Sequence, residues 1–137
     1  MNREFIYTIT KKITEEEIRD LIIDGIENGT TYWAFIHNDT PEFEKCYGKD
    51  LCTSEAIAEI ILNGGNVIIT DLEGDEEPKY HLTLERLLKG IEMNAKERPW
   101  DSDLENYDSI TSDCILQYAL YDELMFGWWH IYRQICQ

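Results

Sequence analysis

Basic residues are scarce in this sequence. Its 137 residues include 12 lysines and arginines against 28 aspartates and glutamates, so the formal net charge is −16. A field of this sign repels nucleic acid and anionic membranes, and it attracts cations and basic proteins. We therefore expect no direct binding of nucleic acid and no membrane contact. A basic protein partner and simple solubility both remain open as explanations of the charge.

Long apolar runs and chemical motifs are also missing. No apolar run approaches membrane length, and residues 1–20 carry too many charges for a secretory signal. The four cysteines include no C-x-x-C pair. His37, Cys46 and Cys52 lie near one predicted loop, but their spacing is irregular and a fourth metal ligand is not evident. We therefore expect a cytoplasmic protein that is not an enzyme, has reduced cysteines and uses no cofactor.

What the chain does contain is enough apolar material for a core. Apolar residues make up 43% of the sequence and aromatic residues 12%, which indicates a folded chain despite the charge. The length predicts a single domain over residues 1–137.

The predicted centre of the fold runs from Asn63 to Gly90. Asn63, Gly64 and Gly65 end a helix, residues 66–71 form a strand, and residues 72–78 form an acidic turn. Residues 80–82 form a second strand, so the two strands make a hairpin. Thr83 then caps a helix that begins at Leu84 and ends between Gly90 and Glu92.

Weaker patterns define the rest of the chain. The remaining predicted elements are a strand over residues 4–10, a helix from the Thr14–Glu17 capping box to Gly29, a strand or helical turn over residues 31–36, a long loop over residues 38–52, a helix capped by Thr53 or Ser54, and a helix capped by Asp108 over about residues 110–125. The expected class is α+β, with a small antiparallel sheet around a central hairpin, packed by about four helices.

Four motifs occur in a fixed order along the chain. They are Gly29 to Trp33; Leu62 to Gly65 with Ile68 and Asp71; Leu82 to Gly90; and Asp108 to Asp113 with Gln117 to Leu120 and Glu123 to Gly127. This order resembles a family of small acidic bacteriophage and prophage proteins of unassigned function. The resemblance implies a phage origin and a bacterial host cell, and small acidic phage proteins often resemble anti-defence proteins, including CRISPR inhibitors. The tail from Trp128 lies outside the matching part.

Two acidic clusters are the first candidate binding sites. They consist of Glu73, Asp75, Glu76 and Glu77 in the hairpin turn, and of Asp101, Asp103, Glu105 and Asp108 in a later loop. Carboxylates along a surface can imitate phosphates and occupy a basic channel of a nucleic-acid-binding protein. Neither cluster has the spaced ligands and glycine of a calcium loop, so solvated turns are favoured over metal sites.

Aromatic pairs are the second candidate. Tyr32–Trp33 and Trp128–Trp129 suit either core packing or a protein-binding face. Neighbouring residues of a strand point to opposite faces, so one member of each pair can be exposed. Asp113 and Gln117 stand at i and i+4, which predicts a hydrogen bond inside the fold. Four tryptophans and eight tyrosines exceed what one small core must hold, which favours a homodimer.

These features favour one function over another. The first hypothesis is a phage-encoded anti-defence protein that inhibits a host nucleic-acid-handling immune protein, using the two acidic clusters together with Trp128 and Trp129. The alternative is a small-molecule binder that sequesters a nucleotide immune signal. That alternative needs clustered cations, and the sequence offers Arg86, Lys89, Lys96 and Arg98.

Overall fold

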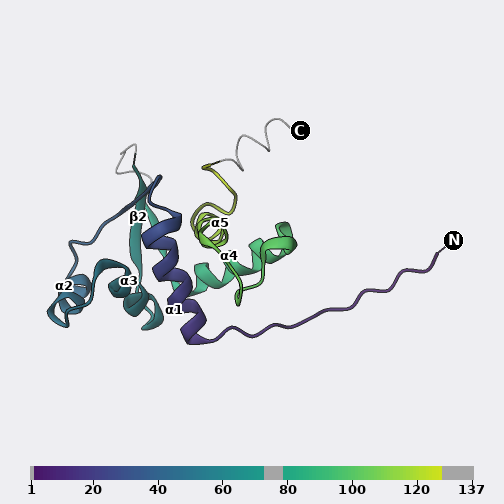
Figure 1. The fold of residues 1–137 in the computed structure, drawn as a ribbon, viewed down its shortest axis with the longest axis horizontal. Helices are drawn as coiled ribbons and strands as arrows, with labels where there is room; N and C mark the ends of the chain where they lie inside the picture. Colours follow the sequence, from purple (N-terminus) through teal and green to yellow (C-terminus); the bar gives the residue numbers. More distant parts are fainter. Residues whose placement is uncertain (1, 73–78, 128–137) are drawn as a thin grey trace.

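The computed structural model describes residues 2–72 and 79–127 of the chain. In order, its elements are α1 (Glu15–Asp24), the π-helical turn η1 (Gly25–Gly29), β1 (Ala34–Ile36), α2 (Pro41–Gly48), α3 (Thr53–Leu62), β2 (Val67–Asp71), β3 (Tyr80–Leu82), α4 (Leu84–Glu97), the 3-10 turn η2 (Pro99–Asp101) and α5 (Ser109–Tyr121). Figure 1 shows their arrangement. The strands form one antiparallel sheet in the order β1-β2-β3, so the predicted α+β class and central hairpin are confirmed.

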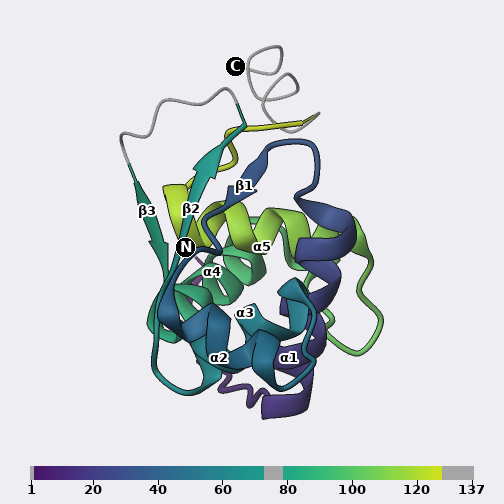
Figure 2. The same cartoon turned by 90° about the vertical axis from the view of Figure 1, so that its left-hand side faces the viewer.

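The sheet turns one face to the helices, and the other face is partly exposed to solvent. Val67 and Ile69 of β2 are buried together with Leu82 of β3. Alternate residues point the other way, and Phe35 of β1 is 51% exposed while His81 of β3 is also exposed. Figure 2 shows α4 and α5 behind the sheet and α2 below it. Within the described residues, no helix has the length and apolar composition needed to cross a membrane.

Helix α5 forms the centre of the helical layer. Residues 111–120 are all buried, and α4, α1 and η1 pack around them. A β-carbon at Gly90 of α4 would lie 2.5 Å from the carbonyl oxygen of Ile115. A β-carbon at Gly25 would lie 2.5 Å from Cδ1 of Leu116. At Gly90 the obstacle is backbone, so only glycine fits there, whereas at Gly25 a β-carbon would require the Leu116 side chain to shift.

Three of the four predicted helix caps are confirmed. Thr14 and Glu17 form the capping box of α1, and the hydroxyl of Thr83 accepts a hydrogen bond from a backbone N–H in the first turn of α4. Asp108 caps α5 by accepting from two backbone N–H groups. Gly64 has a φ of +87°, the left-handed conformation expected after a helix.

The predicted strand over residues 4–10 is wrong. These residues are extended and exposed, and none of them forms a backbone hydrogen bond with another described residue. The composition of the segment suits a strand, but a strand also needs a neighbour whose N–H and C=O groups it can meet. Sequence pattern reports the first condition and not the second.

The predicted loop over residues 38–52 is also wrong, because it contains α2. The hydroxyl of Thr40 accepts a hydrogen bond from the Phe43 N–H, and Pro41 occupies the first turn, where its missing N–H costs nothing. Phe43 and Cys46 then point into the core. Turn-forming residues that suggested a loop thus mark the start of a helix. The predicted cap of the next helix is wrong as well, because α3 begins at Thr53 after the N-cap Cys52, so neither Thr53 nor Ser54 caps it.

Two predicted helix ends need correction. Helix α4 continues through Gly90 to Glu97, since the glycine serves the contact with α5 and does not end the helix. Helix α5 ends at Tyr121 and not near residue 125, because Asp122 adopts a φ of 61°. The predicted end of the first helix at Gly29 is confirmed, with η1 continuing α1 to that residue.

Candidate functional site

The acidic loop of residues 101–108 divides into structural and exposed carboxylates. Asp101 is half-buried, lies 2.7 Å from the guanidinium of Arg98 and accepts a hydrogen bond from Thr111. Asp108 is exposed but holds the first turn of α5. Both residues therefore have a role in the fold, which the sequence predicted for Asp108 as a helix cap but not for Asp101.

Asp103 and Glu105 are the exposed carboxylates of this loop. Asp103 accepts hydrogen bonds from the backbone N–H of Glu105 at 2.9 Å and from the Asn106 side chain at 3.1 Å. These bonds, with a smaller contribution from nearby Lys11, lower the pKa of Asp103. Asp103 consequently stays charged to lower pH than an ordinary aspartate.

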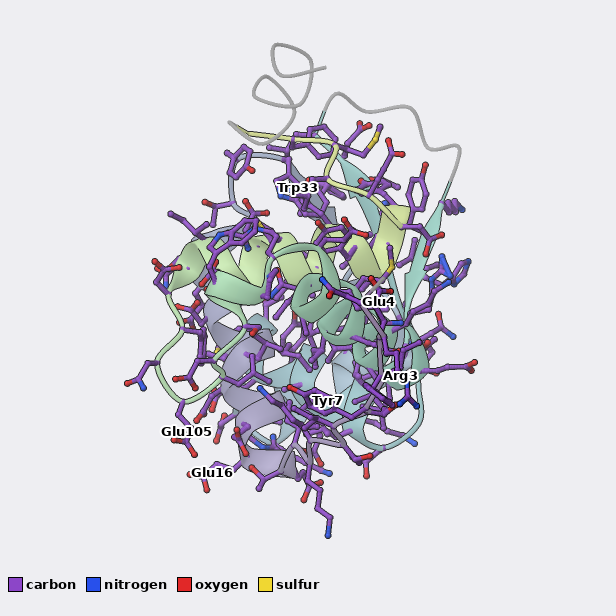
Figure 3. The ribbon with its side chains drawn as sticks, turned by 90° about the vertical axis from the view of Figure 1, so that its right-hand side faces the viewer. Arg3, Glu4, Tyr7, Glu16, Trp33 and Glu105 are labelled. Atoms are coloured by element: carbon purple, nitrogen blue, oxygen red, sulfur yellow. The ribbon has the colours of Figure 1, made fainter. Side chains whose placement is uncertain are left out.

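Helix α1 supplies further carboxylates beside this loop. Glu16 and Asp20 are exposed and stand at i and i+4, on one side of the helix. Tyr107 of the loop packs against α1, and its pKa is raised first by burial and then by the charges of Asp24 and Asp20. Figure 3 shows Glu16 and Glu105 close to each other at one end of the molecule.

We call Glu16, Asp20, Asp103 and Glu105 the acidic face. The hydroxyl of Ser109 donates to Asp24 at 3.4 Å and that of Ser112 donates at 2.6 Å, so the start of α5 is bonded to the end of α1. No ion pair joins the four carboxylates of the face to a lysine or arginine in the described ranges. The sequence analysis did not name Glu16 or Asp20 as candidate binding residues, so this juxtaposition was missed.

Other predicted binding residues cannot be placed on this face. Glu73, Asp75, Glu76, Glu77, Trp128 and Trp129 lie outside the described residues. The acidic face consequently contains two of the predicted carboxylates, Asp103 and Glu105, with two that were not predicted.

The first aromatic pair belongs to a buried polar network. Trp33 is 2% exposed and donates from Nε1 to Asp113 at 2.7 Å, while Tyr32 is 50% exposed and donates its hydroxyl to the same carboxylate at 2.6 Å. Burial and the neighbouring carboxylate raise the pKa of Tyr32. Gln117 donates to Asp113 at 3.0 Å, which confirms the predicted hydrogen bond. The expectation that one member of the pair is exposed is also confirmed.

Gln117 extends this network to the segment after α5. Its side-chain carbonyl accepts from the backbone N–H groups of Met125 at 2.8 Å and Phe126 at 2.9 Å. The ring of Phe126 stacks on Trp33 with 5.2 Å between centroids. The chain is thus anchored to the core as far as Phe126.

Each of the four predicted cations of α4 and its end contacts another group of the chain. Arg86 donates to the carbonyl oxygen of Ala119, and Lys89 pairs with Asp122 on the surface. Lys96 pairs with Glu92 one turn away. Arg98 is buried and forms its ion pair with Asp101. Nothing in this arrangement favours the capture of a nucleotide.

Metal-binding and nucleophilic groups give no alternative site. Across residues 2–72 and 79–127, no three His, Cys, Asp or Glu side chains could hold a metal ion together. Burial raises the pKa of the Cys114 thiol to about 12, so it is protonated at neutral pH.

Comparison of the chain with protein-family models, curated proteins and solved structures finds no match.

Proposed function

We propose that the protein binds a basic, nucleic-acid-handling protein through its acidic face and blocks the groove that normally holds nucleic acid. The supporting observation is that exposed carboxylates from two separate parts of the chain lie together on the surface. Helix α1 presents Glu16 and Asp20, and the loop before α5 presents Asp103 and Glu105.

The electrostatics suit this role. The net charge of −16 attracts a basic groove over a long range, and the acidic face supplies the carboxylates that would contact it. Tyr107 lies near Asp20 and Asp24 of α1, and Ser109 and Ser112 of α5 donate to Asp24, so the backbone of the loop is held next to α1. A fixed array of charges loses less conformational entropy on binding than flexible side chains do.

The resemblance to phage proteins supplies the proposed setting. We propose that the target is a host immune protein that handles nucleic acid, and that the protein acts in the bacterial cytoplasm. Trp128, Trp129 and the acidic residues 73–77 remain proposed partner contacts from the sequence.

The test starts with capture of a partner from bacterial lysate by the full chain. Glu16→Gln, Asp20→Asn, Asp103→Asn and Glu105→Gln are then combined in one variant. We expect its association with the captured partner to weaken by about tenfold or more, and the parent's binding to fall steeply with salt, since the Debye length is only about 10 Å at 0.1 M. Nucleic acid should compete with the parent.

The control changes the same number of charges elsewhere. Asp39→Asn, Glu42→Gln, Glu44→Gln and Asp50→Asn alter exposed carboxylates in and around α2. This variant should bind nearly as well as the parent. Equal weakening by both variants would show that only total charge matters, and binding that ignores salt and nucleic acid would refute the proposal.

A further inference from the structure

Residues 2–12 form an extended arm that leaves the body on the side away from β2 (Figure 1). Phe5, Ile6, Tyr7 and Ile9 are all exposed in it, Ile6 at 98%. Their backbone forms no hydrogen bond with another described residue. Successive large apolar side chains without cover mark an interaction surface in a soluble protein.

The arm has the chemistry of a strand without a neighbour. Its central residues are β-branched or aromatic, and alternation places Phe5, Tyr7 and Ile9 on one side. Such a segment can add itself to the exposed edge of a sheet, where main-chain hydrogen bonds supply affinity and alternate side chains supply specificity.

Charge identifies the partner. The arm holds three basic residues, Arg3, Lys11 and Lys12, and one acidic residue, Glu4. The rest of the chain therefore holds the other 27 acidic and nine basic residues. A positive arm on so negative a body is attracted to a second copy of the same body.

The sheet offers this arm an edge at β1. The His37 N–H bonds to Ile68 and the Leu72 N–H bonds to Trp33, so alternate residues of this strand face β2. Ile36, between Phe35 and His37, therefore directs its N–H and C=O groups away from β2, toward the outer edge of the sheet. Half-exposed Phe35 and exposed Leu72 add apolar surface beside it.

The other edge, β3, suits the arm less well. Lys79 immediately precedes it and places a positive charge, the sign of the arm, beside this edge, while exposed His81 adds a polar side chain. Residues 30–40, around β1, contain no lysine or arginine. The choice between the two edges therefore falls on β1.

We propose that the arm of one copy pairs as a strand with the β1 edge of a second copy, and that reciprocal exchange forms a dimer. When extended, 11 residues reach about 35 Å, which takes the arm well beyond its point of attachment. The two contacts are equivalent, as in a two-fold symmetric dimer. This inference is independent of the acidic face and of any host partner.

The arm is tested in the purified full chain by sedimentation at micromolar concentration. The parent should be a dimer. Ile6→Pro removes one N–H and restricts the backbone of the arm, so this variant should be a folded monomer. Ile6→Thr keeps a β-branched side chain and should stay dimeric, which makes it the matched control.

The edge is tested by Phe35→Lys, which places a charge beside β1 and repels Lys11 and Lys12. This variant should be a monomer, and Phe35→Thr should show weakened association if the lysine variant does not fold. A mixture of Ile6→Pro with Phe35→Lys should form heterodimers, because the intact arm of one chain meets the intact edge of the other.

Several outcomes would overturn the proposal. A monomeric parent would do so, including one whose arm amides are protected within the same chain. A dimer that persists in Ile6→Pro would place the interface elsewhere, as would two monomeric variants that fail to associate when mixed. A dimer lost on neutralising the acidic face but kept in Phe35→Lys would move the docking site to that face.

Discussion

At the scale of single residues, Asp113 joins parts of the chain that are far apart in sequence. It receives hydrogen bonds from Tyr32, Trp33 and Gln117, and Gln117 in turn holds the backbone after α5. Burial nevertheless raises the pKa of Asp113, because the three bonds only partly offset the lost hydration. A neutral group that keeps the same acceptor can therefore replace the carboxylate.

We predict that Asp113→Ala loses about 2–4 kcal/mol of unfolding free energy at pH 7, since it leaves three donors without their acceptor. Asp113→Asn should lose much less. Its carbonyl can serve Trp33 and Gln117, and the half-exposed hydroxyl of Tyr32 can turn to accept from the new amide. Urea unfolding of the three proteins measures the difference.

The pH dependence has a definite sign. Because the folded pKa of Asp113 lies above 3.8, the folded parent binds a proton at a pH where the unfolded chain does not. The parent should therefore gain stability relative to Asp113→Asn as pH falls through the folded pKa, and the gain should level off below about 3.8. A constant difference from pH 7 to pH 4 would contradict this account.

Residue patterns predicted the local contacts and not the distant ones. The i and i+4 spacing of Asp113 and Gln117 was sufficient to predict their bond, and Thr14, Thr83 and Asp108 were recognised as caps. No spacing relates Asp113 to Tyr32, which lies 81 positions earlier. The acidic face has the same origin, because only tertiary packing brings α1 to the loop of residues 102–108.

At the scale of elements, the crossing of α4 and α5 depends on Gly90. We predict that Gly90→Ala costs about 2–3 kcal/mol, because the new β-carbon would meet the backbone of Ile115 and Ala119. Gly48→Ala, in α2, meets no atom within 4 Å and should be neutral or stabilising by about 0.5–1 kcal/mol. Thermal unfolding of both variants tests this, and equal effects would contradict the packing argument.

The sequence predicted element boundaries correctly where their cause is local and wrongly where their cause is tertiary packing. Composition predicted the β2–β3 hairpin, since both strands and the acidic turn between them are local signals. It failed at Gly90, where a residue typical of helix ends serves interhelical packing, and at residues 4–10, where a strand-forming sequence lacks a partner in its own chain. Helix α2 was missed because Thr40 and Pro41 suit both a loop and a helix start.

At the scale of the whole molecule, the charge of −16 opposes folding through self-repulsion. Raising salt from about 0.01 M to about 1 M shortens the Debye length from about 30 Å to about 3 Å. We predict that the melting temperature rises over this range, by roughly 4 °C for each kcal/mol of repulsion removed. Scanning calorimetry at fixed pH measures it, and a melting temperature that falls with salt would show that ion pairs outweigh repulsion.

The close approaches of Gly25 and Gly90 to α5 differ in what lies opposite the glycine. At Gly25 the obstacle is the end of a flexible side chain, Cδ1 of Leu116, whereas at Gly90 it is the backbone itself. A shortened residue 116 can make room for alanine at position 25, so two harmful changes there can compensate for each other. No side-chain change on α5 removes the backbone of Ile115. During evolution, position 25 can therefore drift together with its neighbour, while position 90 stays fixed for as long as α4 and α5 cross in this way.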